Sequence, residues 1–133
     1  MRNLAGLISV RSAHDVAETV RRFRAAAEAN DLTIFAEIDH GRNAAEVGLE
    51  LRPTCLLIFG NPRSGTPLMQ MSQTIGIDLP LKVLAWQDEE GIVWLSCATP
   101  QWLADRHELG SGAAQTVDAM TAGIQKLAMV ATS

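Results

Sequence analysis

Apolar and polar residues follow two periods along the chain, and these periods predict an order of strands and helices. Short apolar or alternating runs bounded by turn-forming residues predict five strands, at residues 3–10, 32–39, 54–59, 82–87 and 92–97. Apolar residues spaced three or four positions apart predict long helices at residues 13–30 and 113–132. A short helix is expected at residues 99–107.

Two further helices are expected directly after strands. Residues 40–42 are expected to form a turn, after which Asn43 caps a short helix that begins at Ala44. Residues 60–62, Gly-Asn-Pro, are expected to break the third strand. Ser64 or Thr66 then caps the helix that follows.

The polar pattern of the strands predicts a sheet that is covered on one side only. In the second strand, alternation places Ile34, Ala36 and Ile38 on one face and the residues between them on the other. The acidic turn that ends in Gly91 predicts a hairpin between the last two strands. Because this hairpin breaks regular βα alternation, the order predicts one α+β domain over residues 1–133. Its antiparallel sheet has about five strands, with helices packed on one face.

Composition and charge narrow the classes of function. The net charge is −4, so no overall basic field attracts nucleic acid or an acidic membrane. No apolar run approaches the length of a membrane span, and nothing near Met1 resembles a signal peptide. Cys55 and Cys97 have no CxxC spacing and are expected in the core, which suits a reducing compartment. We therefore expect a cytoplasmic protein without nucleic-acid or membrane partners.

The loop from Gly60 to Thr66 is the best candidate for a binding site. It carries glycines, hydroxyls, the Asn61 amide and the Arg63 guanidinium at an expected helix start, where free N–H groups attract anions. The ligand-binding set expected here is Gly60, Asn61, Arg63, Ser64, Gly65 and Thr66. At least one of the two glycines is expected at positive φ. The alternative is a purely structural turn, because the loop has neither a phosphate-loop nor a dinucleotide motif.

Three polar residues outside the loop are candidates for the same site or for acid–base chemistry. Asp39 and His40 follow the second strand, and His107 lies near the end of the expected helix at residues 99–107. His40 is expected near the loop if the second and third strands are neighbours. A strand-terminal turn with hydrogen-bonded polar groups is the structural alternative. No pair of possible ligands has zinc spacing, so we expect no metal, and no motif indicates a cofactor.

Several motifs occur in an order and spacing that resemble a known bacterial family. They include Ile-Asp-His at 38–40, Ile-Phe-Gly-Asn-Pro at 58–62, Gly-Thr-Pro-Leu-Met-Gln at 65–70, Asp-Leu-Pro-Leu-Lys at 78–82 and Arg-His at 106–107. Together they resemble the family catalogued as domain of unknown function 302 over nearly the whole chain. The resemblance implies an α+β domain with a TBP-like antiparallel sheet, and homodimers among small members, but no activity. Where the family usually has Tyr after its last strand, this chain has Cys97.

Three functions remain open on the sequence. The first is a small-molecule or anion binding module that uses the Gly60–Thr66 loop and His40. The second is a structural or protein-interaction domain without a ligand. The third is an enzyme whose site is built from Asp39, His40 and His107. A homodimer is expected as well, because a small α+β domain leaves sheet edges and apolar surface uncovered.

Overall fold

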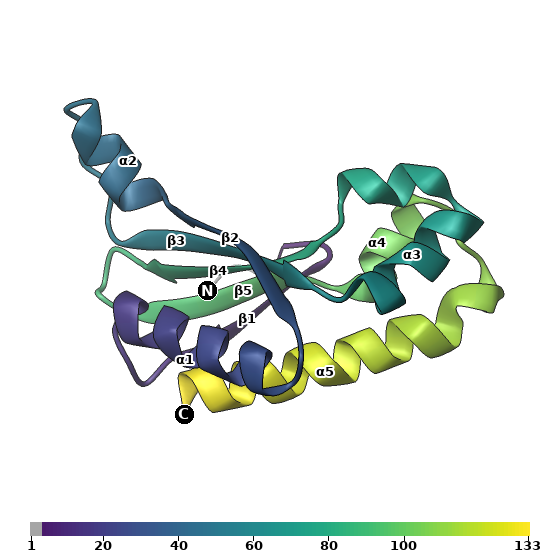
Figure 1. The fold of residues 1–133 in the computed structure, drawn as a ribbon. Helices are drawn as coiled ribbons and strands as arrows, with labels where there is room; N and C mark the ends of the chain where they lie inside the picture. The colour runs from purple at the N-terminus through teal and green to yellow at the C-terminus, as the bar shows by residue number, and fades with distance from the viewer. Residues whose placement is uncertain (1–3) are drawn as a thin grey trace.

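The computed structural model describes residues 4–133 and contains one antiparallel sheet of five strands (Figure 1). In chain order, its elements are β1 (Leu7–Arg11), α1 (Val16–Ala29), β2 (Thr33–Asp39), α2 (His40–Glu46), β3 (Thr54–Gly60), α3 (Pro62–Met71), the 3₁₀ helix η1 (Gln73–Ile77), β4 (Leu81–Gln87), β5 (Val93–Ala98), α4 (Pro100–Arg106), the 3₁₀ helix η2 (Ser111–Ala113) and α5 (Ala114–Thr132). The strand order is β1-β5-β4-β3-β2. The predicted α+β class and antiparallel sheet are confirmed. Asn3, where the first strand was expected to begin, lies outside the described residues.

Helices α1 and α5 pack side by side across one face of the sheet (Figure 1). Leu57 on β3 and Val83 on β4 point toward these helices and are almost fully buried. Phe23 of α1 meets Phe59 of β3 edge to face, with ring centroids 5.0 Å apart. The hydrophobic core therefore lies between the helix pair and this face of the sheet.

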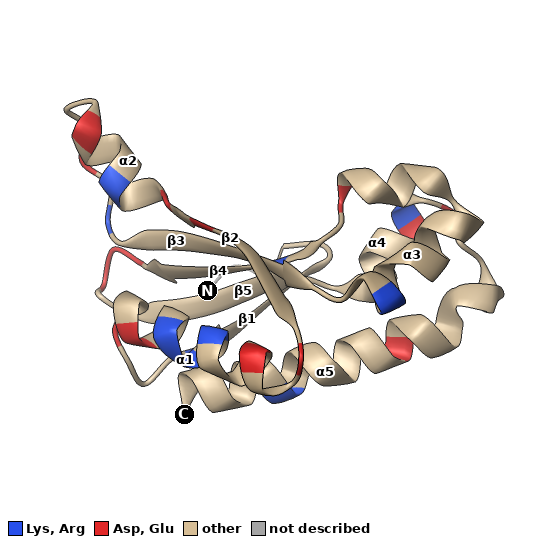
Figure 2. Cartoon of the chain, viewed as in Figure 1, with Lys and Arg blue, Asp and Glu red and all other residues tan. Residues whose placement is uncertain are grey.

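Charged side chains lie mainly outside this core. Figure 2 shows most of the sheet and of α5 free of charge, whereas α1 carries several basic and acidic residues. Those on α1 pair locally: the carboxylate of Glu18 accepts from Arg21, and Arg24 reaches Glu37 on β2. None of the helices within residues 4–133 is long and apolar enough to cross a membrane.

A bulge in β2 changes which of its residues share a face. Ile34 pairs with Phe59, but Ala36 pairs with Ile58, so Phe35 has no opposing residue on β3. Because one extra residue reverses the alternation, Ile34 shares the helix-covered side with Phe59, whereas Ala36 lies on the side of Ile58. The prediction that Ile34, Ala36 and Ile38 share one face is therefore wrong.

Helices α2 and α3 both begin earlier than predicted. Asp39, the last residue of β2, caps α2, and Asn61, the residue that follows β3, caps α3. The Asp39 carboxylate accepts the backbone N–H of Arg42 at 2.9 Å, so α2 begins at His40 and residues 40–42 form its first turn. The Asn61 side chain accepts the backbone N–H of Arg63 at 2.9 Å, and Pro62 occupies the first helical position. The predictions that Asn43 caps α2 and that Ser64 or Thr66 caps α3 are therefore wrong.

Gly60 and Gly65 both have ordinary negative φ, contrary to the prediction. Gly60 completes β3 and Gly65 lies inside α3, so neither has to reverse the chain. Among the described residues, the glycines with positive φ are Gly6, Gly48, Gly91 and Gly110. Gly91 is in the predicted hairpin, which pairs Trp86 with Trp94 across β4 and β5.

Candidate functional site

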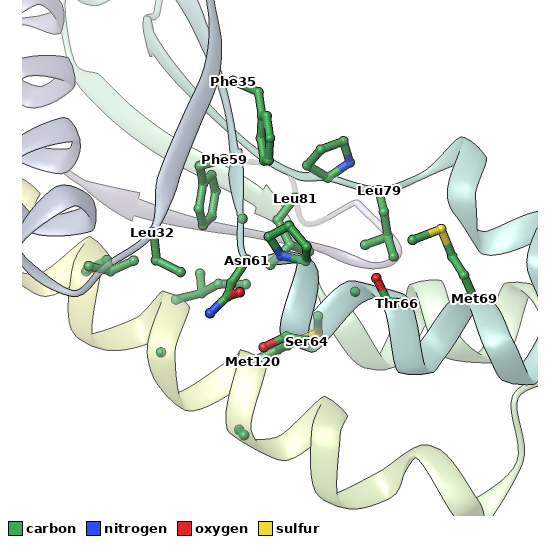
Figure 3. Close-up of a pocket in the computed structure, with 18 residues that line it drawn as sticks. Leu32, Phe35, Phe59, Asn61, Ser64, Thr66, Met69, Leu79, Leu81 and Met120 are labelled. Atoms are coloured by element: carbon green, nitrogen blue, oxygen red, sulfur yellow. The ribbon is translucent and has the colours of Figure 1, made fainter.

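A cavity of about 310 Å³ lies where β3 leads into α3 (Figure 3). The ends of β2, β3 and β4 contribute to its walls, together with α3 and α5. Most of its surface is hydrocarbon or thioether, from Leu32, Phe35, Phe59, Met69, Leu79 and Met120. Five of the predicted site residues line the same cavity, namely Gly60, Asn61, Ser64, Gly65 and Thr66.

Three polar side chains lie on the α3 wall of this cavity. Asn61 and Ser64 point toward the space between α3 and α5, and Thr66 lies one helical position beyond Gly65 (Figure 3). The Asn61 oxygen is engaged in capping, which leaves its amide N–H groups as donors. Neither hydroxyl makes a side-chain hydrogen bond within residues 4–133, so both remain available to a ligand. The described lining contains no Asp, Glu, Lys, Arg or His.

The loop does not have the free donors that the anion site required. Asn61 takes up three of the backbone N–H groups concerned: its side chain accepts from Arg63, and its carbonyl accepts from Ser64 and Gly65 at 2.9 and 3.1 Å. Arg63 is exposed and does not line the cavity. The geometry of this site therefore suits an uncharged ligand better than an anion.

His40 lies at the other end of β2 from this loop. The strands β2 and β3 are neighbours as expected, but they are antiparallel: Thr33 pairs with Gly60, whereas Asp39 pairs with Cys55. Six residues of extended chain, about 20 Å, separate the two ends. The structure therefore does not bring Asp39 or His40 to the cavity, and Asp39 instead caps α2.

His107 belongs to a separate polar cluster beside α4. Its Nε2 lies 2.5 Å from a carboxylate oxygen of Asp78, and its Nδ1 lies 2.9 Å from the hydroxyl of Thr74. Arg106 also contacts the Asp78 carboxylate. The expected grouping of His107 with Asp39 and His40 does not occur. Asp78 begins the Asp-Leu-Pro-Leu-Lys motif at residues 78–82, but nothing in its sequence neighbourhood indicates a histidine partner 29 positions away.

The cysteines are buried thiols of low reactivity. Burial raises the pKa of Cys97 to about 12 and that of Cys55 to about 11, the latter with a contribution from Glu37 and Asp39. Cys97 donates its weak S–H to the carbonyl of Ala98. Within residues 4–133, no group of three or more His, Cys, Asp or Glu side chains is placed to hold a metal ion.

Sequence comparison finds relatives that are about twice as long as the matched segment. The chain is 50% identical over 119 residues, 90% of its length, to proteins named fluoride-specific ion channel FluC 1 of Brucella suis biovar 1 (strain 1330) and of Brucella abortus biovar 1 (strain 9-941). The match covers 47% and 44% of these proteins, respectively. The chain therefore spans about half the length of the curated relatives it matches.

A solved structure and a family profile cover nearly the whole chain. The crystal structure of an uncharacterized conserved protein DUF302 from Bacillus stearothermophilus superposes with a TM-score of 0.75, at 18% identity, over 97% of both chains. This likeness shows that the two proteins share the fold. The profile of the domain of unknown function DUF302 matches residues 8–127. The chain belongs to the DUF302 family.

Proposed function

We propose that this chain is a small-molecule binding module whose ligand occupies the cavity between β3, α3 and α5. The observation that supports this most directly is the cavity itself, which at about 310 Å³ falls at the lower end of the range for ligand sites. Its largely apolar lining with a few polar groups on one wall is the usual make-up of such sites.

The chemistry of the lining defines the class of ligand. A charged ligand would lose its hydration without gaining a counter-charge, which is costly. An apolar body with one or two neutral hydrogen-bonding groups would pack against Phe35, Phe59 and Met120. Its polar end would face Asn61 and Ser64, whose amide and hydroxyl groups suit a carbonyl or hydroxyl.

The test is a thermal-shift screen with small, uncharged, amphipathic molecules, followed by a variant that fills the cavity. Gly123 of α5 lines the cavity, and a Cβ added there meets no atom within 4 Å, so Gly123→Leu can place a side chain at this wall without a backbone clash. A ligand at 100 times its Kd stabilises the native state by about 2.7 kcal/mol. We expect Gly123→Leu to abolish most of that shift.

The matched control is Ala122→Leu, which adds the same side chain at an exposed position of α5 outside the cavity. This variant should keep the ligand-induced shift of the parent chain. Ser64→Ala should reduce the shift for ligands with a polar end and leave it unchanged for pure hydrocarbons. Failure of the whole library at about 1 mM, or an undiminished shift in Gly123→Leu, would contradict the proposal.

We also propose that two copies associate through the face of the sheet opposite α1 and α5, which α4 borders at Trp102 and Leu103. Register places Leu56, Leu84 and Trp86 on this face, where they are only half-buried. They line a second, larger cavity of about 440 Å³, together with Leu7 of the edge strand β1. This hollow apolar surface supports the alternative function of an interaction domain, with a second copy as the partner.

A further inference from the structure

A hydroxyl, an imidazole and a carboxylate form a continuous hydrogen-bonded series beside α4. The Thr74 hydroxyl lies 2.9 Å from Nδ1 of His107, and Nε2 of His107 lies 2.5 Å from the Asp78 carboxylate. Thr74 belongs to η1, Asp78 follows that element directly, and His107 caps the end of α4. A nucleophile next to a base that a third group orients is the arrangement by which hydroxyls are activated.

The partners of His107 determine which of its nitrogens carries a proton. An ionised carboxylate only accepts, so the Asp78 contact requires hydrogen on Nε2. Arg106 donates to both oxygens of the same carboxylate, at 2.9 and 3.0 Å. A neutral imidazole then presents Nδ1 as an acceptor, and the hydrogen that it accepts belongs to the Thr74 hydroxyl.

Exposure within the series matches these roles. The side chain of His107 is 8% exposed and that of Asp78 is 18% exposed, so the base and the group that orients it are mostly shielded from water. Thr74 is exposed and accessible to a substrate, and its hydroxyl also lies 3.2 Å from the hydroxyl of Ser72. We propose that Thr74 is the nucleophile of an acyl-transfer site in which His107 is the general base and Asp78 positions the imidazole.

The reaction follows from these positions. As Oγ1 of Thr74 bonds to the carbonyl carbon of an ester, its proton moves to Nδ1 of His107. Collapse of the tetrahedral intermediate breaks the bond to the leaving oxygen, which takes up that proton, and leaves Thr74 acylated. Water then attacks the acyl-threonine, gives one proton to Nδ1 and releases the carboxylic acid, and the proton returns to Oγ1. The net reaction is ester hydrolysis, and water is the second reactant.

The open position of Thr74 indicates the substrate class. An ester has a better leaving group than an amide and needs less assistance at the carbonyl. A small acyl ester can approach an exposed hydroxyl from solvent without first entering a closed cavity. The site is separate from the proposed ligand cavity, whose described lining includes neither Thr74 nor His107.

The experiment uses p-nitrophenyl acetate and the full chain. We expect an initial burst of p-nitrophenolate of up to one equivalent, and an acetyl group on the peptide that contains Thr74, detected by mass spectrometry. Thr74→Val should abolish the burst and the adduct and reduce turnover about 100-fold, within the range for acid–base-assisted steps. Thr74→Ser should keep both, because it retains the hydroxyl.

Exposed imidazoles can also hydrolyse this ester, so His40→Gln is the control. His40 is exposed and begins α2, which lies at the opposite end of the sheet from α3 and α4 (Figure 1), so its replacement should leave the burst unchanged. His107→Gln should remove the burst in a protein whose circular dichroism is that of the parent. An absent adduct on Thr74, or equal rates for the parent and Thr74→Val, would overturn the proposal and leave the series as a structural link between η1 and α4. The Val and Ser variants decide the question even if His107→Gln unfolds.

Discussion

Gly6 is the residue whose local conformation most depends on glycine. Its φ is +71°, and a Cβ placed on it would lie 2.2–2.5 Å from three ring atoms of Trp102. Its carbonyl accepts the backbone N–H of Thr99 at 2.8 Å, so the segment cannot easily move away from α4. The constraint arises from contact between residues 96 positions apart in the sequence.

Gly6→Ala should lower the free energy of unfolding by about 2–4 kcal/mol, from the unfavourable φ and the overlap with Trp102. Urea unfolding followed by tryptophan fluorescence measures this change. Gly60→Ala is the matched control, because Gly60 has an ordinary φ and its added Cβ would lie 3.5 Å from Pro80. We expect the control to change stability by less than about 1 kcal/mol. A larger loss at Gly60 than at Gly6 would contradict this interpretation.

At the scale of elements, the start of α3 depends on the side chain of Asn61, which accepts a backbone N–H that has no acceptor within the helix. The Asn61 oxygen accepts from Arg63, while Pro62 has no N–H to satisfy. The same residue presents its amide to the ligand cavity. Asn61 therefore has two roles: it stabilises the start of α3, and it forms part of the polar wall of the proposed binding site.

Asn61→Ala should destabilise the chain by about 1 kcal/mol, the usual cost of losing a side-chain cap. Asn61→Asp keeps an acceptor and adds a charge that the helix N-terminus favours, so its stability should stay close to that of the parent. Denaturant midpoints of the three proteins test this order. Equal destabilisation by Ala and Asp would show that the cap is not the source of the effect.

At the scale of the whole molecule, the sheet has one covered face and one open face. Helices α1 and α5 shield the first, whereas the second carries Leu56, Leu84 and Trp86 around a hollow apolar surface. Some apolar residues are more exposed still, such as Met129 at 68% on the outer side of α5. The open sheet face differs from such single residues because its apolar side chains are contiguous.

Light scattering at micromolar concentration should give the mass of a homodimer, with an interface above roughly 1,000 Å² in total. Leu84→Glu, at the middle of the open face, should shift the mass to that of one chain while circular dichroism stays unchanged. Met129→Glu adds the same charge to α5 and should leave the dimer intact. A single-chain mass for the parent protein would remove this proposal.

Much of the fold was predictable from sequence because its signals are local. The apolar runs and the acidic turn before Gly91 predicted the five strands and the closing hairpin, and periodic apolar residues predicted α1 and α5. These signals depend on residues only a few positions apart. The helix starts were less accurate, because Asp39 and Asn61 compete with several nearby residues that also have capping side chains.

The sequence by itself determined the fold class and the order of the strands and α-helices, because these depend on local pattern. It also singled out five residues that line the candidate cavity. Only the tertiary structure decided the bulge at Phe35 and the antiparallel register that separates His40 from Gly60. It also brought α5 against the cavity and His107 against Asp78. Strand register and helix docking are set by contacts between distant segments, which no local window contains.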